Sequence, residues 1–135
     1  MTGSSVVLLD TSVFIARESA RPLAPLPDRV AVSVVTIGEL QLGVLAARDD
    51  VTRARRADTL NLARSADPIA VSEAVMVTWA RLVDDCRRRG VHRTVRLTDA
   101  LIAATAVEHG LPVVTQDRDY ESIASAFPAL RVLTV

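Results

Sequence analysis

The sequence of 135 residues contains no lysine, and all sixteen of its basic residues are arginines. Several catalytic classes are excluded by this absence, because each depends on a Lys side chain. P-loop NTPases place a Lys on their bound phosphates, Schiff-base enzymes need its amine, and phosphoryl-aspartate folds normally keep a Lys near the phosphate. Arginine is then the only permanently cationic side chain that can hold a phosphate.

Cysteine and long apolar runs are scarce as well. Cys86 is the only cysteine, so the chain has no disulfide framework and no zinc-ligand spacing, which fits a reducing cytoplasm. No apolar run approaches the ~20 residues that span a bilayer, and the N-terminus has no basic segment followed by a long apolar core. We therefore expect a cytoplasmic protein that is neither secreted nor inserted in a membrane.

Aromatic residues make up only 3% of the chain, although 50% of it is hydrophobic. The core must therefore be built from Val, Leu, Ala and Ile, a composition common where helices cover both faces of a parallel sheet. The length is that of one domain, so we expect residues 1–135 to form a single domain.

Short apolar runs alternate along the chain with segments of helical spacing, and no hairpin turn signal separates them. The segment 21–29 holds three prolines and is a loop. Strands are predicted at 6–9, 30–35, 67–71, 112–115 and 130–135, and helices at 11–19, 36–48, 51–64, 72–90, 98–109 and 119–126. This order predicts an α/β fold of three layers, α/β/α, around a central parallel sheet of about five strands.

Acidic residues stand at or just past the ends of several strand-like runs: Asp10, Glu39, Asp99 and Asp117, with Asp119 close behind. In a parallel sheet the carboxyl ends of the strands share one edge, so these side chains can converge. Converging carboxylates need a cation, and Mg²⁺ or Mn²⁺ suits an all-oxygen site. The reaction that such clusters most often serve is hydrolysis of a phosphodiester.

Each acid also has a purely structural interpretation. Asp10 could cap a helix, Thr36 and Glu39 form a capping-box pattern, and Asp99 falls in a first helical turn, where the helix dipole favours an anion. The two acids at 117–119 are ordinary turn and N-cap residues. Taken singly, each acid could therefore be structural.

Asp99 is the hardest of these acids to explain by capping alone. It lies between Leu97 and the apolar run ALIAATA, so its helix is predicted to be almost wholly buried. A buried carboxylate needs a partner, which here is an Arg, a backbone cap or a metal.

Four motifs occur in the same order as in a known family. They are an Asp followed by Thr after the first strand, an acid within S-x-x-x-x-x-E-L, an Asp followed by three apolar residues and Ala-Ala, and a T-x-D-x-D-[FY] ending. Through VVLLDTSVFI, SVVTIGELQLG and LTDALIAATAVEHGLPVVTQDRDY, the chain resembles the PIN-domain nucleases, and within them the VapC-type toxins of bacterial toxin-antitoxin pairs. The resemblance covers essentially the whole chain and implies a PIN-like fold.

The resemblance implies a metal-dependent endoribonuclease that leaves a 5′-phosphate and a 3′-hydroxyl. Its acidic quartet would bind Mg²⁺ or Mn²⁺, most directly through Asp10 and Asp99, with Glu39 and Asp117 acting through water or a second ion. Asp119 is a further candidate ligand, or else a capping residue, because the family varies at this position. Small hydroxyl residues that would support the site are Thr11, Ser12 and Thr115.

RNA is the expected substrate, and it must be held beside these acids by flanking cations. One Arg group is Arg53, Arg55, Arg56 and Arg64. The preferred RNA-contacting group is Arg87, Arg88, Arg89, Arg93 and Arg96, which leads toward Asp99. His92 lies in this loop and could touch substrate. For most of these arginines a solvated helix face is the competing interpretation.

The family also implies an antitoxin partner that occludes the site, and usually a homodimer. By analogy, the apolar helix pair at 36–62 is the antitoxin surface, although the same positions could be core. Two other functions stay open. A haloacid-dehalogenase-like phosphatase fits Asp10 and Thr11, but Ser12 replaces its second acid and its Lys is missing. A non-catalytic PIN-fold regulator is the other alternative.

Overall fold

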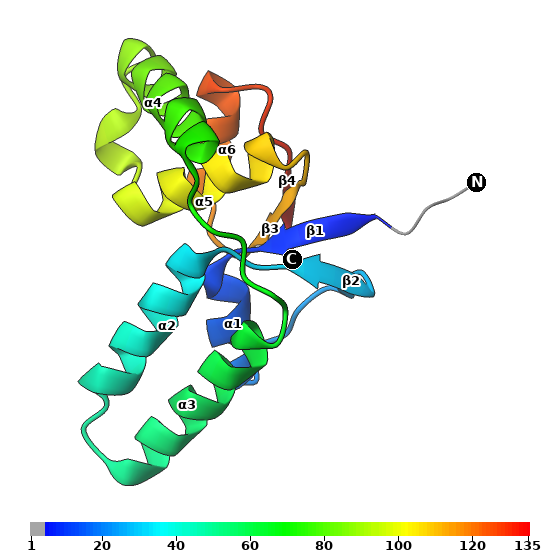
Figure 1. Ribbon diagram of the computed structural model, residues 1–135, viewed down its shortest axis with the longest axis vertical. Helices are drawn as coiled ribbons and strands as arrows, with labels where there is room; N and C mark the ends of the chain where they lie inside the picture. The colour runs from blue at the N-terminus through cyan, green and yellow to red at the C-terminus, as the bar shows by residue number, and fades with distance from the viewer. Residues whose placement is uncertain (1–4) are drawn as a thin grey trace.

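A computed structural model describes residues 5–135 (Figure 1). Its elements, in chain order, are β1 (Val6–Leu9), α1 (Thr11–Glu18), β2 (Arg29–Ala31), α2 (Val34–Ala46), α3 (Asp50–Arg64), α4 (Glu73–Arg88), the 3₁₀ turn η1 (His92–Thr94), α5 (Leu97–Glu108), β3 (Val113–Thr115), α6 (Asp119–Ala126) and β4 (Val132–Thr134). No helix in the described part of the chain is long and apolar enough to cross a membrane.

The strands form one parallel sheet in the order β2-β1-β3-β4. Helices lie on both of its faces, with α1, α2 and α3 on one side and α4, α5 and α6 on the other (Figure 1). The predicted three-layer arrangement is therefore confirmed. It places the carboxyl ends of β1 and β3, which are neighbours, directly before Asp10 and at Thr115.

The expected fifth strand, at 67–71, is only a single bridge between Ser33 and Ile69 within residues 5–135. Asp67 adopts a positive φ of 51° and Pro68 has no N–H, so neither residue continues a strand. Ile69 alone pairs, because its N–H donates to the carbonyl of Val32 and its carbonyl accepts from Val34.

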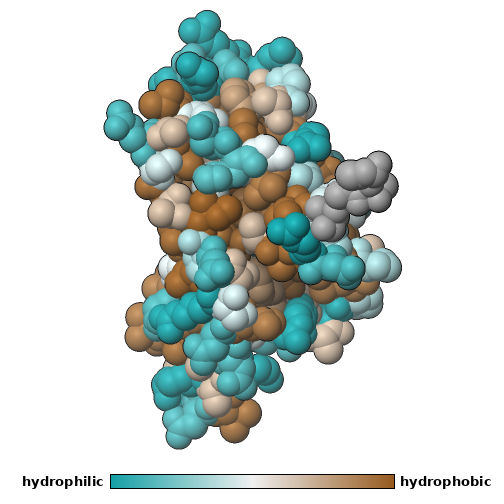
Figure 2. Space-filling model, turned by 45° about the vertical axis from the view of Figure 1, so that its right-hand side comes forward, coloured by the Kyte–Doolittle hydropathy of each residue, from teal (hydrophilic) through white to brown (hydrophobic). Residues whose placement is uncertain are grey.

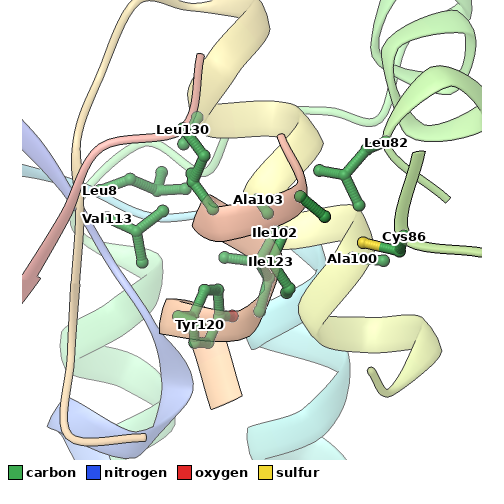
Figure 3. Packing of buried hydrophobic residues seen from close by; sticks show 12 residues of the cluster. Leu8, Leu82, Cys86, Ala100, Ile102, Ala103, Val113, Tyr120, Ile123 and Leu130 are labelled. Atoms are coloured by element: carbon green, nitrogen blue, oxygen red, sulfur yellow. The ribbon is translucent and has the colours of Figure 1, made fainter. Parts of the chain in front are cut away.

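Alternation along β1 divides the core into two parts, since successive strand residues point to opposite faces. Leu8 packs on the side of α4, α5 and α6, where buried aliphatic residues meet Tyr120 at one end of the cluster (Figure 3). Val7 and Leu9 face α1, α2 and α3. Each such side chain contributes roughly 1.5–3 kcal/mol to the stability of the fold when fully buried. Packing on both faces therefore fixes the position of the carboxyl edge of the sheet.

Helices α2 and α3 form an antiparallel hairpin, as their adjacent patterns predicted. Beside α1, β2 and the end of α3, a hollow of about 580 Å³ is lined largely by apolar residues, among them Leu9, Phe14 and Leu26. Figure 2 shows hydrophobic residues gathered around the middle of the molecule, while hydrophilic residues cover its two ends.

The predicted strand at 30–35 is too long, and the predicted capping box at Thr36 and Glu39 is wrong. Helix α2 already begins at Val34, because Ser33 is its N-cap and accepts from the N–H of Val35 at 3.0 Å. A side-chain cap and the bridge to Ile69 outweigh the strand preference of the β-branched residues that follow.

Replacing Ser33 with Ala tests this boundary. Ser33 is fully buried and its hydroxyl caps α2, so we expect the free energy of unfolding to fall by about 1 kcal/mol. Urea unfolding of the metal-free protein measures the change. Ser125→Ala is the matched control, because that exposed hydroxyl only bonds a carbonyl of its own helix. Equal stability of the two variants would contradict the cap.

Candidate functional site

Two buried carboxylates meet at the carboxyl edge of the sheet. Asp10 directly follows β1 and is 2% exposed, and Asp99, in the first turn of α5, is fully buried. The phenolic hydroxyl of Tyr120 donates to Asp10 Oδ1 at 2.9 Å and lies 3.5 Å from Asp99 Oδ1. Three segments far apart in the sequence are therefore joined through one hydroxyl group.

Hydroxyl groups from neighbouring elements hold Asp10 in place. Ser12 donates its hydroxyl to Asp10 Oδ2 at 2.7 Å, and Thr115 at the end of β3 donates to the same oxygen at 2.9 Å. The N–H of Ser12 also bonds this oxygen at 3.3 Å, so Asp10 is the N-cap of α1 as well. Capping and site position are thus properties of the same carboxylate.

Glu39 enters the site from α2 through a second pair of hydroxyls. Thr11 donates to Glu39 Oε1 at 2.6 Å, and its oxygen lies 2.9 Å from the hydroxyl of Thr36. Because the Thr11 proton goes to Glu39, Thr36 is the donor in the second bond. Glu39 is partly exposed, so its carboxylate borders the site from the solvent side.

Arg96 supplies the cation that balances Asp99. Its Nε lies 3.2 Å from Asp99 Oδ2 and its Nη2 lies 3.2 Å from Asp99 Oδ1, a two-point contact across one turn. The same Nη2 is 3.9 Å from Asp117 Oδ2. The Arg96 side chain is 64% exposed, so a largely solvated cation covers a buried anion.

Burial sets the protonation of this cluster. Loss of solvation raises the pKa of Asp99 above its ordinary value, although Arg96 opposes the shift, and the charges of Asp10 and Asp117 raise it further. Burial and the neighbouring carboxylates raise the pKa of Tyr120 well above its usual range. Tyr120 therefore stays protonated and acts as a donor. The hydrogen bond to Asp99 raises the pKa of Arg96, which stays charged.

Asp117 and Asp119 follow β3 at the outer side of the site. Asp117 is anchored by its own N–H, which donates to Thr115 Oγ1 at 2.8 Å, and its Oδ1 accepts from the N–H of Asp119 at 2.9 Å. Asp119 is exposed at the start of α6. No hydrogen bond joins the Asp119 side chain to the other acids in residues 5–135. Asp117 lies nearer the cluster than Asp119 does, because its Oδ2 is 3.9 Å from Arg96 Nη2.

Among the predicted RNA-contacting arginines, Arg96 is the one that touches the acids. Arg87 and Arg88 pair with Asp84 at 3.4 and 3.0 Å on the exposed end of α4, and Arg89 and Arg93 are also exposed. In the other Arg group, two members have local structural partners: Arg53 pairs with Asp50, and Arg56 donates to the carbonyl of Gly43.

The donor set suits a divalent cation, because it consists of carboxylate and hydroxyl oxygens with no sulfur or imidazole. Within the described residues, no three acidic, His or Cys side chains already surround one point as metal ligands. Arg96 instead bridges Asp99 and Asp117. Two buried carboxylates, of which Asp99 is paired with an exposed Arg side chain, therefore form an anionic site.

Comparison with known proteins settles the family. A model described as "PIN domain" matches residues 7–126. Ribonuclease VapC8 of Mycobacterium tuberculosis is 72% identical over 101 residues, covering 75% of this chain and 90% of the relative. The chain belongs to the PIN-domain family. Ribonuclease VapC4 of the same organism is 45% identical over 133 residues, covering 95% of each chain, which places the protein among the VapC ribonucleases.

A solved structure agrees with this PIN-domain assignment. The crystal structure of VapBC-5, a member of the VapBC family of toxin-antitoxin systems from M. tuberculosis, superposes with a TM-score of 0.85 at 38% identity. The superposition covers 97% of this chain and 99% of the VapBC-5 chain. The parallel sheet and the helices on both its faces are therefore those of a VapC-type PIN domain.

Two residues that organise this PIN-domain site were not singled out for these roles by the sequence. Tyr120 appears there only as the last letter of T-x-D-x-D-[FY], and its hydroxyl joins Asp10 to Asp99. Arg96 was expected to face RNA, and it contacts Asp99. The signals available were an aromatic residue one position after an acid and an Arg three positions before a buried Asp.

Substituting Tyr120 with Phe removes the shared donor and keeps the ring. We expect the metal-free PIN domain to lose about 1–2 kcal/mol of stability, because two buried carboxylates lose a hydrogen bond. Thermal and urea unfolding in EDTA measure the loss. Thr105→Val is the control, since this buried hydroxyl bonds only a helix carbonyl and should cost less. A Tyr120 variant as stable as the parent protein argues against the shared bond.

Asp99→Asn tests the cost of the buried charge. The pKa of Asp99 is higher in the folded than in the unfolded protein, so its contribution falls as pH rises above the unfolded value of about 3.8. At neutral pH in EDTA, we expect the Asp99→Asn variant to be more stable than the parent protein by about 1 kcal/mol, a gain that fades below about pH 4. Unfolding across pH measures it.

The control for this effect is Asp84→Asn, which removes an exposed carboxylate and should change stability little at any pH. The expectation is contradicted if the Asp99 variant is less stable than the parent protein at neutral pH, by more than the control variant is. The ionised carboxylate would then be net stabilising.

Proposed function

We propose that this protein is an endoribonuclease that depends on Mg²⁺ or Mn²⁺ and acts as the toxin of a toxin-antitoxin pair. The observation that carries the proposal is the buried Asp10–Asp99 pair beneath an exposed, displaceable Arg96. Membership among the VapC ribonucleases supports the same activity. Asp10 and Asp99 would be the principal metal ligands, and Glu39 and Asp117 would support them.

The residues of the chain divide the chemical tasks. When bound, a divalent cation supplies a coordinated water of lowered pKa and neutralises charge that develops on the scissile phosphate. Ser12 and Thr115 fix the orientation of the Asp10 carboxylate by donating to one of its oxygens. Thr11 does the same for Glu39. Asp119, exposed and next to Asp117, is a further candidate for contact through water.

Arg96 would exchange partners when the site is loaded. Its guanidinium now neutralises Asp99, and a cation held by the carboxylates makes that contact redundant. The side chain is mostly exposed, so it can turn toward a phosphate of the RNA at little cost. The exposed arginines of α4 and η1 extend the same positive surface, through Arg87, Arg88, Arg89 and Arg93.

An antitoxin would cover the exposed side of the α2–α3 hairpin. Leu42, Leu45 and Val51 in the segment 36–62 are exposed and not core, which supports a docking surface on this hairpin. A cavity of about 340 Å³ beside this hairpin is lined by Leu40, Arg56 and Glu39, among others. A peptide lying there would reach the acidic site. VapBC-5 of M. tuberculosis is described as a toxin-antitoxin system, which supports this partner.

We also propose that the protein forms a homodimer, as the family resemblance implies. Exposed apolar residues of α4, Met76 and Val77, lie outside the α2–α3 hairpin and remain free for a second copy when an antitoxin is bound. The phosphatase alternative loses its support once the chain belongs to the PIN-domain family. The non-catalytic alternative becomes an outcome of the nuclease test.

The test is cleavage of cellular RNA by the purified, antitoxin-free protein with Mg²⁺ or Mn²⁺. EDTA should abolish cleavage, and Asp99→Asn or Glu39→Gln should lower the rate by roughly 10²-fold or more. Asp58→Asn, which changes an exposed carboxylate of α3 away from the proposed RNA surface, is the matched control and should cleave normally. Cleavage that survives EDTA contradicts the metal mechanism, and intact RNA in every sample with the parent protein favours the non-catalytic regulator.

A further inference from the structure

A second, smaller cavity adjoins the acidic site. It has a volume of about 190 Å³ and lies between α4, the η1 turn and the start of α5. We call it the Trp79 cavity, after the only tryptophan of the chain. Its lining residues include Trp79, Val83, His92, Arg96, Leu97 and Ala100. None of these residues belongs to the acidic quartet.

Arg96 connects the Trp79 cavity to the acids. The side chain that lines the cavity is the one that donates to Asp99 at 3.2 Å through both Nε and Nη2. Ala100, also in the lining, follows Asp99 directly on α5. A group held in the cavity is therefore separated from the buried carboxylates by a single side chain.

The lining is mostly apolar, yet it contains an unsatisfied donor. Trp79 Nε1 is the one buried side-chain nitrogen or oxygen in the described residues that lacks a hydrogen-bond partner. Buried donors are rarely left unpaired, because an unpaired one destabilises the folded protein. Protein atoms cover this nitrogen in the structure, so a ligand with acceptor atoms would satisfy it only if the indole turns toward the cavity.

Size and charge restrict what such a ligand can be. Pockets for drug-sized molecules measure about 300–1,000 Å³, so this cavity has room for one small ring system. Exposed arginines flank it in the sequence at both sides, with Arg87 to Arg89 after Cys86 and Arg93 after His92. An apolar, aromatic-lined cavity with Arg96 in its wall, and with exposed arginines next to its lining residues in the sequence, favours a planar group attached to phosphates.

We propose that the Trp79 cavity receives one base of single-stranded RNA, next to the phosphate that is cut, and so helps to select the cleavage site. The identity of the ligand as RNA rests on the proposed nuclease function. An unpaired base brings a flat apolar surface for Trp79 and Leu97 and acceptor atoms at its edge. An apolar side chain of a protein partner would leave both the indole N–H and the arginines unused.

Binding can be measured without cleavage, because Trp79 is the only tryptophan and its fluorescence reports directly on the cavity. The full-length, antitoxin-free protein is titrated in EDTA with short oligomers of A, C, G or U. We expect a saturable change in Trp79 emission with at least one base. An oligomer of the same length without bases should give little or no change at the same concentrations.

Substitutions at the rim separate base binding from general attraction to phosphate. His92→Ala and Leu97→Ala alter exposed lining residues outside the quartet, and we expect about three- to tenfold weaker binding of the preferred oligomer. Leu133→Ala, an exposed apolar residue of β4 that is absent from the lining, should bind like the parent protein. Circular dichroism confirms that all three variants fold.

A second readout uses the cleaved RNA itself. Sequencing the product ends should show a base preference beside the cut that weakens in the His92 and Leu97 variants and persists in the Leu133 variant. Trp79→Phe keeps a ring but removes the N–H, so it should shift which base is preferred. The expected result is a changed preference with metal-dependent cleavage retained.

The outcomes separate the two proposals. Equal fluorescence changes with base-free and base-containing oligomers, or unchanged binding and preference in both rim variants, would overturn the base site while the nuclease stands. Base-dependent binding by a protein that never cleaves RNA would overturn the nuclease and keep the base site. A response to an apolar peptide, with none to any RNA, would assign the cavity to a protein partner and overturn the proposal.

Discussion

The arrangement of this protein depends on burying two carboxylates, Asp10 and Asp99, at the edge of a parallel sheet and keeping them close together. Burial of a charged group costs free energy, and the neighbouring groups offset this cost by donating hydrogen bonds to the carboxylates. Tyr120 donates to one carboxylate and approaches the other, while hydroxyls from α1 and β3 hold Asp10. The sheet supplies the geometry, since β1 and β3 are adjacent and parallel and end at the same edge.

Stability and function oppose each other at this edge. Selection for stability alone would favour an apolar residue in place of a fully buried Asp, because replacing buried ion pairs by apolar residues is often neutral or stabilising. The chain instead has Asp99 at this position. Burial raises the pKa of its carboxyl group, and the exposed Arg96 balances its charge. Such a site attracts cations. Arg96 balances the charge of Asp99 here and also lines the Trp79 cavity, so one side chain connects the proposed metal site to the surface that would meet RNA.

The sequence predicted the layers and the positions of the acids, because both depend on local pattern. Period-2 alternation and helical spacing identify which faces are buried, and acids after apolar runs indicate the sheet edge. It missed three features. Ser33 starts α2 inside an apparent strand, because the β-branched residues beside this local cap resemble a strand. The segment after Pro68 makes only one bridge, and Tyr120 reaches Asp10 across 110 positions. These last two features depend on contacts distant in sequence, which leave no local pattern.

The most direct measurement of the central claim is a crystal structure of the protein grown with Mn²⁺, in which anomalous scattering locates the ion. The account predicts an anomalous peak within bonding distance of both Asp10 and Asp99, with the Arg96 guanidinium withdrawn from Asp99. It is contradicted if Mn²⁺ binds elsewhere, or nowhere, while Arg96 keeps its two-point contact with Asp99.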